Sequence, residues 1–181
     1  MKRLAFWSLA ACLVLYCHPL MAADVASSAS SAKKLTGLMA AGQLDAVAAH
    51  DASQPDRFVA ALLYPNAELL VIAAKYDVPP ALQLLLDQKK YRDVYGILQT
   101  SPGASEQVFF IDMLADGLSA ESADVLYEPG NKQTVFDETW RKQHALGEHE
   151  YLAKFETADT LYTRLLQTLI DAVAPPLTTS R

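Results

Sequence analysis

The fold class depends on residues 53–76, which read SQPDRFVAALLYPNAELLVIAAKY. Ser53 and the aspartate three positions later form a capping-box pattern, in which two side chains bind free backbone N–H groups at the start of a helix. The apolar run that follows ends at Pro65, which stops a helix, and Asn66 is a residue type that caps the next one. We therefore predict one short helix before Pro65 and a second over residues 67–75.

Helical signals continue outward from this stretch in both directions. Pro79 and Pro80 suit a first helical turn, the one part of a helix that tolerates proline. Apolar residues at helical spacing over 161–173 predict a long C-terminal helix. Only residues 108–111, Val-Phe-Phe-Ile, also have the composition of a buried strand. We predict an all-α domain of short antiparallel helices, arranged as stacked hairpins of the repeat-protein kind, with a longer C-terminal helix.

The start of the chain indicates export. Two basic residues precede an apolar run that ends near Tyr16, and Pro19 and several small residues follow, which is the layout of a secretory signal peptide. The run is shorter than the roughly twenty apolar residues of a membrane-spanning helix. We therefore predict a signal peptide over residues 1–23, a periplasmic or secreted location, and no stable membrane insertion after cleavage behind Ala22 or Ala23.

The rest of the chain is predicted to form one domain. Residues 24–32 are rich in serine and alanine and have no apolar period, so they are assigned to a flexible leader. The helical domain is assigned to residues 33–174. Two prolines then end the last helix, and residues 175–181 are assigned to a disordered polar tail.

Charge and cysteine content exclude several classes of function. The formal net charge is -6, which disfavours nucleic acid and anionic membrane surfaces as partners. The only cysteines, Cys12 and Cys17, lie in the predicted signal peptide. A mature chain without cysteine excludes a disulfide scaffold, a thiolate zinc site and a cysteine nucleophile.

The densest polar cluster offers weak candidates for a metal site. His144 and Glu148 are four residues apart, and Asp137 is seven before His144, so one helix would place all three on the same face. A protein metal site needs three or four converging ligands, and the spacing of zinc proteases is absent. Glu121 followed by Ser122 begins the pattern of lytic transglycosylases, but its second segment is missing. We predict no metal, no cofactor and no catalytic residue.

The tyrosines supply the leading functional hypothesis. Tyr91 and Tyr95 share one face of a predicted helix, and Tyr76 precedes the neighbouring helix. Tyrosine collects in interfaces because it combines a large apolar body with a polar tip. We therefore predict a non-enzymatic accessory, adaptor or inhibitor that binds another envelope or secreted protein through these residues. Two alternatives remain open: a cell-envelope hydrolase with a carboxylate-based site, and a carrier of an apolar ligand.

Overall fold

The chain folds around one antiparallel sheet, in a computed structural model that describes residues 27–51, 53–77, 79–100 and 104–174. The strands are neighbours in chain order: β1 (Ala46–Asp51), β2 (Gln54–Leu63), β3 (Leu69–Tyr76), β4 (Ala104–Asp112), β5 (Asp124–Glu128) and β6 (Lys132–Phe136). The helices are α1 (Ser28–Ala41), α2 (Pro79–Asp87), α3 (Tyr91–Thr100), α4 (Glu138–Gln143) and α5 (Glu148–Val173). The predicted all-α domain with stacked helical hairpins is therefore wrong.

The decisive stretch forms the central hairpin β2–β3 instead of two helices. Its turn has Pro65 at the second position, and the Ala67 N–H donates to the Tyr64 carbonyl over 3.0 Å. Ala67 itself has a φ of 66°, so this is a type I turn followed by a left-handed residue, a common hairpin connection. The proline and asparagine that resemble a helix stop and a helix cap are thus turn residues.

Helices cover the central strands on both faces, which explains the misleading apolar runs. Val59 of β2 and Val71 of β3 belong to one core cluster, whereas Phe58 and Ile72 belong to the other. Strands buried on both faces are continuously apolar, without the alternation that identifies a half-exposed strand. The alanine content of β2 and β3 further favours a helical interpretation.

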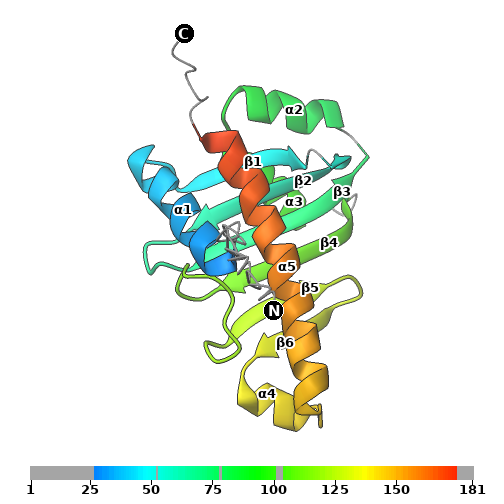
Figure 1. Ribbon diagram of the computed structural model, residues 1–181. Coiled ribbons are helices and arrows are strands. Elements are labelled where there is room, and N and C mark those ends of the chain that lie inside the picture. Colours follow the sequence, from blue (N-terminus) through cyan, green and yellow to red (C-terminus); the bar gives the residue numbers. More distant parts are fainter. Residues whose placement is uncertain (1–26, 52, 78, 101–103, 175–181) are drawn as a thin grey trace, which may run out of the picture.

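The two helical layers differ in extent. In Figure 1, α5 crosses one face of the sheet from the β6 end to the β1 end, with α1 beside it. On the opposite face α3 packs against β1, β2 and β3, and α2 lies near the β1 end of the sheet. The described part of the second core cluster contains no residue of β5 or β6.

Other predicted elements fare differently. Two parts of the predicted helical domain contain strands instead: residues 124–128 form β5 and residues 132–136 form β6. The strand-like composition of residues 108–111 is confirmed by β4, the predicted start at Pro79 by α2, and the C-terminal stripe by α5. Among the described residues, no helix has the length and apolar character needed to cross a membrane.

The chain ends lie partly outside the described residues. The predicted signal peptide and the polar tail 175–181 fall there in full. The predicted leader 24–32 falls there only in part, since α1 begins at Ser28. Ser27 caps this helix: its hydroxyl accepts from the Ser30 N–H, and the Ser30 hydroxyl accepts from the Ser27 N–H, each over 3.2 Å. This reciprocal capping explains why a serine-rich segment is helical here.

Two buried aspartates hold the loop between β4 and β5 against α1 and α5. Asp112 accepts hydrogen bonds from the Gly117 N–H over 2.9 Å and from the Tyr162 hydroxyl over 3.1 Å. Asp124 accepts from the Ser119 N–H over 2.8 Å. Burial raises the pKa of Asp112, and the nearby Asp124 charge adds to this effect. The tyrosine hydroxyl is enclosed in the core, so this cluster is structural.

Candidate functional site

A concave surface lies along the outer edge of β1, and we call it the β1 groove. It is a cavity of about 520 Å³ whose floor includes Ala48 and Asp51, within the size range of ligand pockets. One wall is the C-terminal half of α5, with Arg164 and Ala172, and the other comes from α2 and α3 and includes Tyr91.

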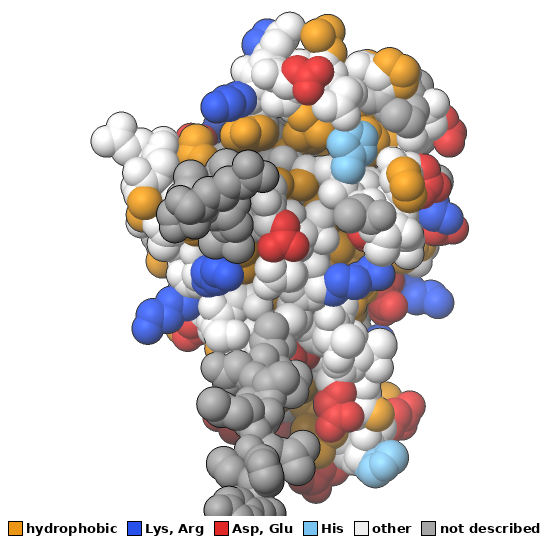
Figure 2. Space-filling view, turned by 45° about the horizontal axis from the view of Figure 1, so that its top comes forward, with side chains coloured by type: hydrophobic (Ala, Val, Ile, Leu, Met, Phe, Trp, Pro, Cys, Tyr) orange, Lys and Arg blue, Asp and Glu red, His pale blue; other side chains and the backbone are white. Residues whose placement is uncertain are grey.

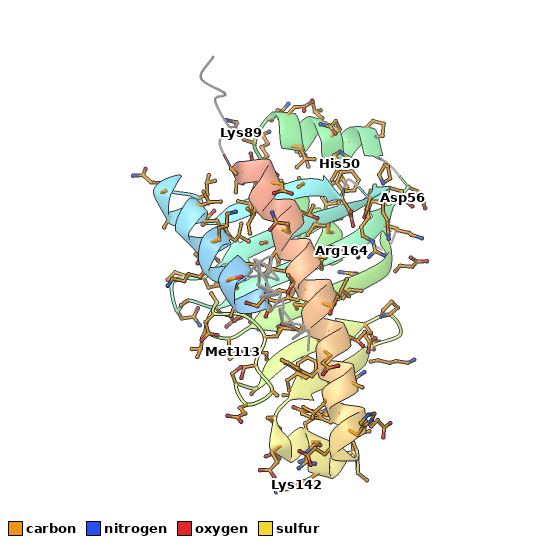
Figure 3. All side chains as sticks on the ribbon, viewed as in Figure 1. His50, Asp56, Lys89, Met113, Lys142 and Arg164 are labelled. Carbon is orange, nitrogen blue, oxygen red and sulfur yellow. The ribbon has the colours of Figure 1, made fainter. Side chains whose placement is uncertain are left out.

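Figures 3 and 2 show the surroundings of this groove. Figure 3 shows Arg164 on α5 and His50 below α2. Figure 2 shows hydrophobic side chains gathered across the top of the molecule, where α2 lies.

The floor of the groove contains backbone groups of an edge strand that no further strand pairs with, and Ala48 at its centre is only 5% exposed. The Leu63 N–H donates to the Asp45 carbonyl over 2.9 Å, so this pair is of the hydrogen-bonded type. Because such pairs alternate along an antiparallel ladder, Val47 and Ala49 also bond inward to β2. The N–H and C=O groups of Ala48 and His50 therefore point outward. In the described part of the chain, no backbone group bonds to them across this edge.

A buried carboxylate lies at the end of the floor. Asp51 is only 2% exposed, and its Oδ1 accepts hydrogen bonds from the Ser53 N–H over 2.9 Å and from the Ser53 hydroxyl over 2.5 Å. Burial raises the pKa of Asp51, but the Ser53 hydrogen bonds and the charges of Arg164 and Arg57 outweigh it and hold that pKa below its usual value. Asp51 is thus ionised at neutral pH, and its Oδ2 has no hydrogen-bond partner among the described residues.

The wall formed by α2 is tied to β1 by a histidine. The His50 ring hydrogen-bonds to the Gln83 amide oxygen of α2, and it packs against Phe58 with ring centroids 4.2 Å apart. Gln83 also donates to Asp87 over 2.8 Å, which fixes its amide. The groove is therefore bounded by side chains with defined orientations.

The three tyrosines of the predicted binding surface occupy different environments. Tyr91 lines the β1 groove and is half-buried. Tyr95 is 4% exposed and packs in the second core cluster, so its ring is not available to a partner, and burial raises its pKa. Tyr76 ends β3 and packs against the same cluster. Tyr91 therefore lies at a cavity wall, whereas Tyr95 and Tyr76 pack in or against the core.

The candidate metal ligands do not share a helix face. Asp137 caps the start of α4, where it accepts from the Trp140 N–H over 2.6 Å. His144 ends α4 and stacks on Trp140, and Glu148 begins α5. No group of three His, Cys, Asp or Glu residues among the described ones could hold a metal ion.

One carboxylate cluster does assemble at this end of the molecule. Glu121, Glu138 and Glu148 line a cavity of about 480 Å³ together with Arg141. Glu138 forms ion pairs with Lys142 over 3.0 Å and with Arg141 over 3.5 Å, and these lower its pKa. A carboxylate whose pKa is lowered by ion pairs stays ionised and is therefore a poor general acid.

Most residues of the β1 groove were not found from the sequence. Asp51 and Arg164 are more than a hundred positions apart, and no local pattern relates them. The alanines before His50 favour a helix, so the sequence does not predict a strand edge there. The one usable signal was Tyr91. Comparisons of this chain with protein-family models, with curated proteins and with solved structures find no match.

Proposed function

We propose that this protein is exported and binds another protein of the cell envelope, as an accessory, adaptor or inhibitor, by taking an extended segment of that partner into the β1 groove. The observation that carries the proposal is the free edge of β1 at the floor of a ligand-sized cavity. An extended segment can add to such an edge through main-chain hydrogen bonds, while pockets along the groove select its side chains. The export part rests on residues 1–23, as argued from the sequence.

The composition of β1 supports this use of its edge. Proteins protect exposed edges with lysine, proline, bulges or short strands. The other edge strand, β6, has five residues and begins with Lys132. β1 has six residues and a register shift after His50, but it differs from β6 in having neither lysine nor proline.

A proline substitution can test the edge without breaking the sheet. Ala48→Pro removes an outward N–H group and no hydrogen bond to β2, and proline is tolerated at this position of an edge strand. We expect the variant to fold and to lose the partner. Ala49→Pro is the matched control, because it removes an inward hydrogen bond to β2 and should destabilise the fold.

Blocking the groove from α5 provides a second, independent test. Ala172→Trp places an indole at the groove wall from an exposed position, and Glu156→Trp places the same ring at an exposed position of α5 about 12 Å along the axis from Arg164. Each tagged variant is used to co-purify partners from an envelope extract, with circular dichroism as the folding control. The partner should be lost with Ala48→Pro and Ala172→Trp and retained with Glu156→Trp.

Two results would contradict the proposal. In the first, both groove variants fold and still co-purify the same proteins as the wild type. The other is a hydrolytic activity of the protein that is lost in Glu121→Gln or Glu148→Gln while partner binding is intact, which would favour the hydrolase alternative.

A further inference from the structure

A second cavity lies on the part of the sheet that α2 and α3 leave uncovered. It has a volume of about 550 Å³ and is lined by Phe109 of β4 and Tyr127 of β5, with Gln99 of α3 on one side and Asn131 of the β5–β6 turn on the other. We name it the sheet-face cavity. It shares no lining residue with the β1 groove.

The floor of this cavity is an aromatic platform. Phe109 and Tyr127 are cross-strand partners, so both side chains project from the same face of the sheet. Their ring centroids are 5.9 Å apart, and both side chains are half-buried. The sheet therefore holds two ring faces in a fixed relation while leaving part of each open to a ligand.

Amide side chains surround the platform. Gln107 donates from its Nε2 to the Leu98 carbonyl over 3.0 Å, which orients its amide and leaves its oxygen available as an acceptor. The side-chain amides of Gln99 and Asn131 have no hydrogen-bond partner among the described residues. Asn131 has a φ of 59°, a conformation that asparagine tolerates, and the turn thereby places it at the rim.

The charges at the rim are compensated. Glu106 pairs with Lys75 over 2.9 Å, and Glu128 pairs with Lys154 over 3.2 Å. These are the only charged residues among the described ones that line the cavity. The site therefore has no unpaired charge with which to select an anion or a cation.

We propose that the sheet-face cavity binds a neutral oligosaccharide. Sugar rings present patches of C–H groups, which pack on the electron-rich faces of aromatic rings. Their hydroxyl groups both donate and accept hydrogen bonds, which matches the carboxamides of the rim. A purely apolar ligand would remove water from those amides without replacing its hydrogen bonds, and this favours the sugar over such a ligand.

The proposal is tested by titrating the full mature chain with two neutral tetrasaccharides, chitotetraose and cellotetraose, followed by backbone amide chemical shifts. At least one tetrasaccharide should shift the amides of β4, β5 and residues 129–131 with a saturable dependence. Phe109→Leu and Tyr127→Leu keep an apolar side chain and remove the ring, and each should weaken binding at least tenfold. Tyr91→Leu in the β1 groove is the matched control and should leave sugar affinity unchanged.

A variant that loses binding counts only if its thermal midpoint is close to that of the wild type. For this reason Gln99→Ala is included. Gln99 is exposed, so the substitution should not affect folding, and it should weaken binding severalfold. Three outcomes overturn the proposal: no shift at these amides with millimolar amounts of either sugar, unchanged affinity in both aromatic variants, or shifts there with an apolar peptide and not with either sugar.

Discussion

Replacing Gly117 by alanine tests whether the loop between β4 and β5 packs against the start of α1. Gly117 has a φ of 98°, in the region that L side chains avoid. A Cβ atom built there would lie 2.3 Å from the Ala29 backbone nitrogen and 2.7 Å from the Ser28 carbonyl carbon. Both belong to the backbone of the first turn of α1, so no side-chain rotation can relieve the overlap. The loop and the helix would have to separate.

The cost follows from the contacts that this separation would break. The backbone conformation alone costs about 1–2 kcal/mol for an L residue. The Leu118 N–H donates to the Ser28 hydroxyl over 3.1 Å, a hydrogen bond worth about 0.5–1.5 kcal/mol. The Gly117 N–H donates to the Asp112 carboxylate, and a hydrogen bond to a charged group contributes about 1.5–3 kcal/mol. We expect Gly117→Ala to lower the free energy of unfolding by about 3–6 kcal/mol, a large fraction of a typical domain's stability.

Gly130→Ala is the matched control for this substitution. Gly130 also has a positive φ, of 81°, but no atom lies within 4 Å of the Cβ that alanine would add. The free energy of unfolding of Gly130→Ala should therefore fall only by the conformational contribution of about 1–2 kcal/mol. Urea denaturation followed by circular dichroism measures both values. Equal losses for the two variants would refute the argument, because they would show that α1 does not pack against Gly117.

Two further predictions concern the core. Leu165→Ala on α5 should cost about 2–5 kcal/mol because the side chain is fully buried, whereas Leu152→Ala on the same helix, at 43% exposure, should stay within about 0.5 kcal/mol in urea denaturation. The pKa of Asp112 is raised in the folded protein, so its stabilising contribution is present at low pH and is lost as pH rises through that pKa. The stability difference between wild type and Asp112→Asn should therefore be larger near pH 3.5 than at pH 7, and a difference independent of pH would contradict this.

The helices that sequence analysis found are those with local signals of their own. The start of α2 could be predicted locally, because within a helix proline fits only the first turn. The apolar stripe of α5 is also visible because its other side faces water: Leu165 and Leu169 are buried, whereas Glu156 is exposed. A half-exposed helix displays its period in the sequence.

The strands were missed because their environment removes the corresponding signal. The run from Phe58 to Leu62 is apolar at every position, and alternate residues pack against different helical layers. Which layer each residue contacts depends on helices far away in the chain, and no short segment contains that information. The strand-like composition at residues 108–111 stood out because two phenylalanines and two β-branched residues are adjacent there.

The candidate site was less predictable than the fold, for a related reason. The β1 groove combines the outward backbone groups of β1 with Arg164 of α5 and Tyr91 of α3. The direction of backbone groups cannot be recognised from residue types. If residues 46–51 are interpreted as part of a helix, no strand edge is predicted there. Tyr91 could be proposed because tyrosine is informative by itself, whereas Tyr95, one turn later on the same helix, turned out to pack in the core.

Both candidate surfaces depend on the insertion of α2 and α3 between β3 and β4. These strands are antiparallel neighbours, and a short turn would suffice to join them. The helices instead cover β1 to β3 and leave the rest of that face open, which produces the sheet-face cavity. Tyr91 at the start of α3 lines the β1 groove, and Gln99 near its end lines the other cavity, about 12 Å further along the axis. Strand pairing alone would need no such insertion: the two helices bury the second apolar face of β1 to β3, and their edges thereby form walls of both cavities.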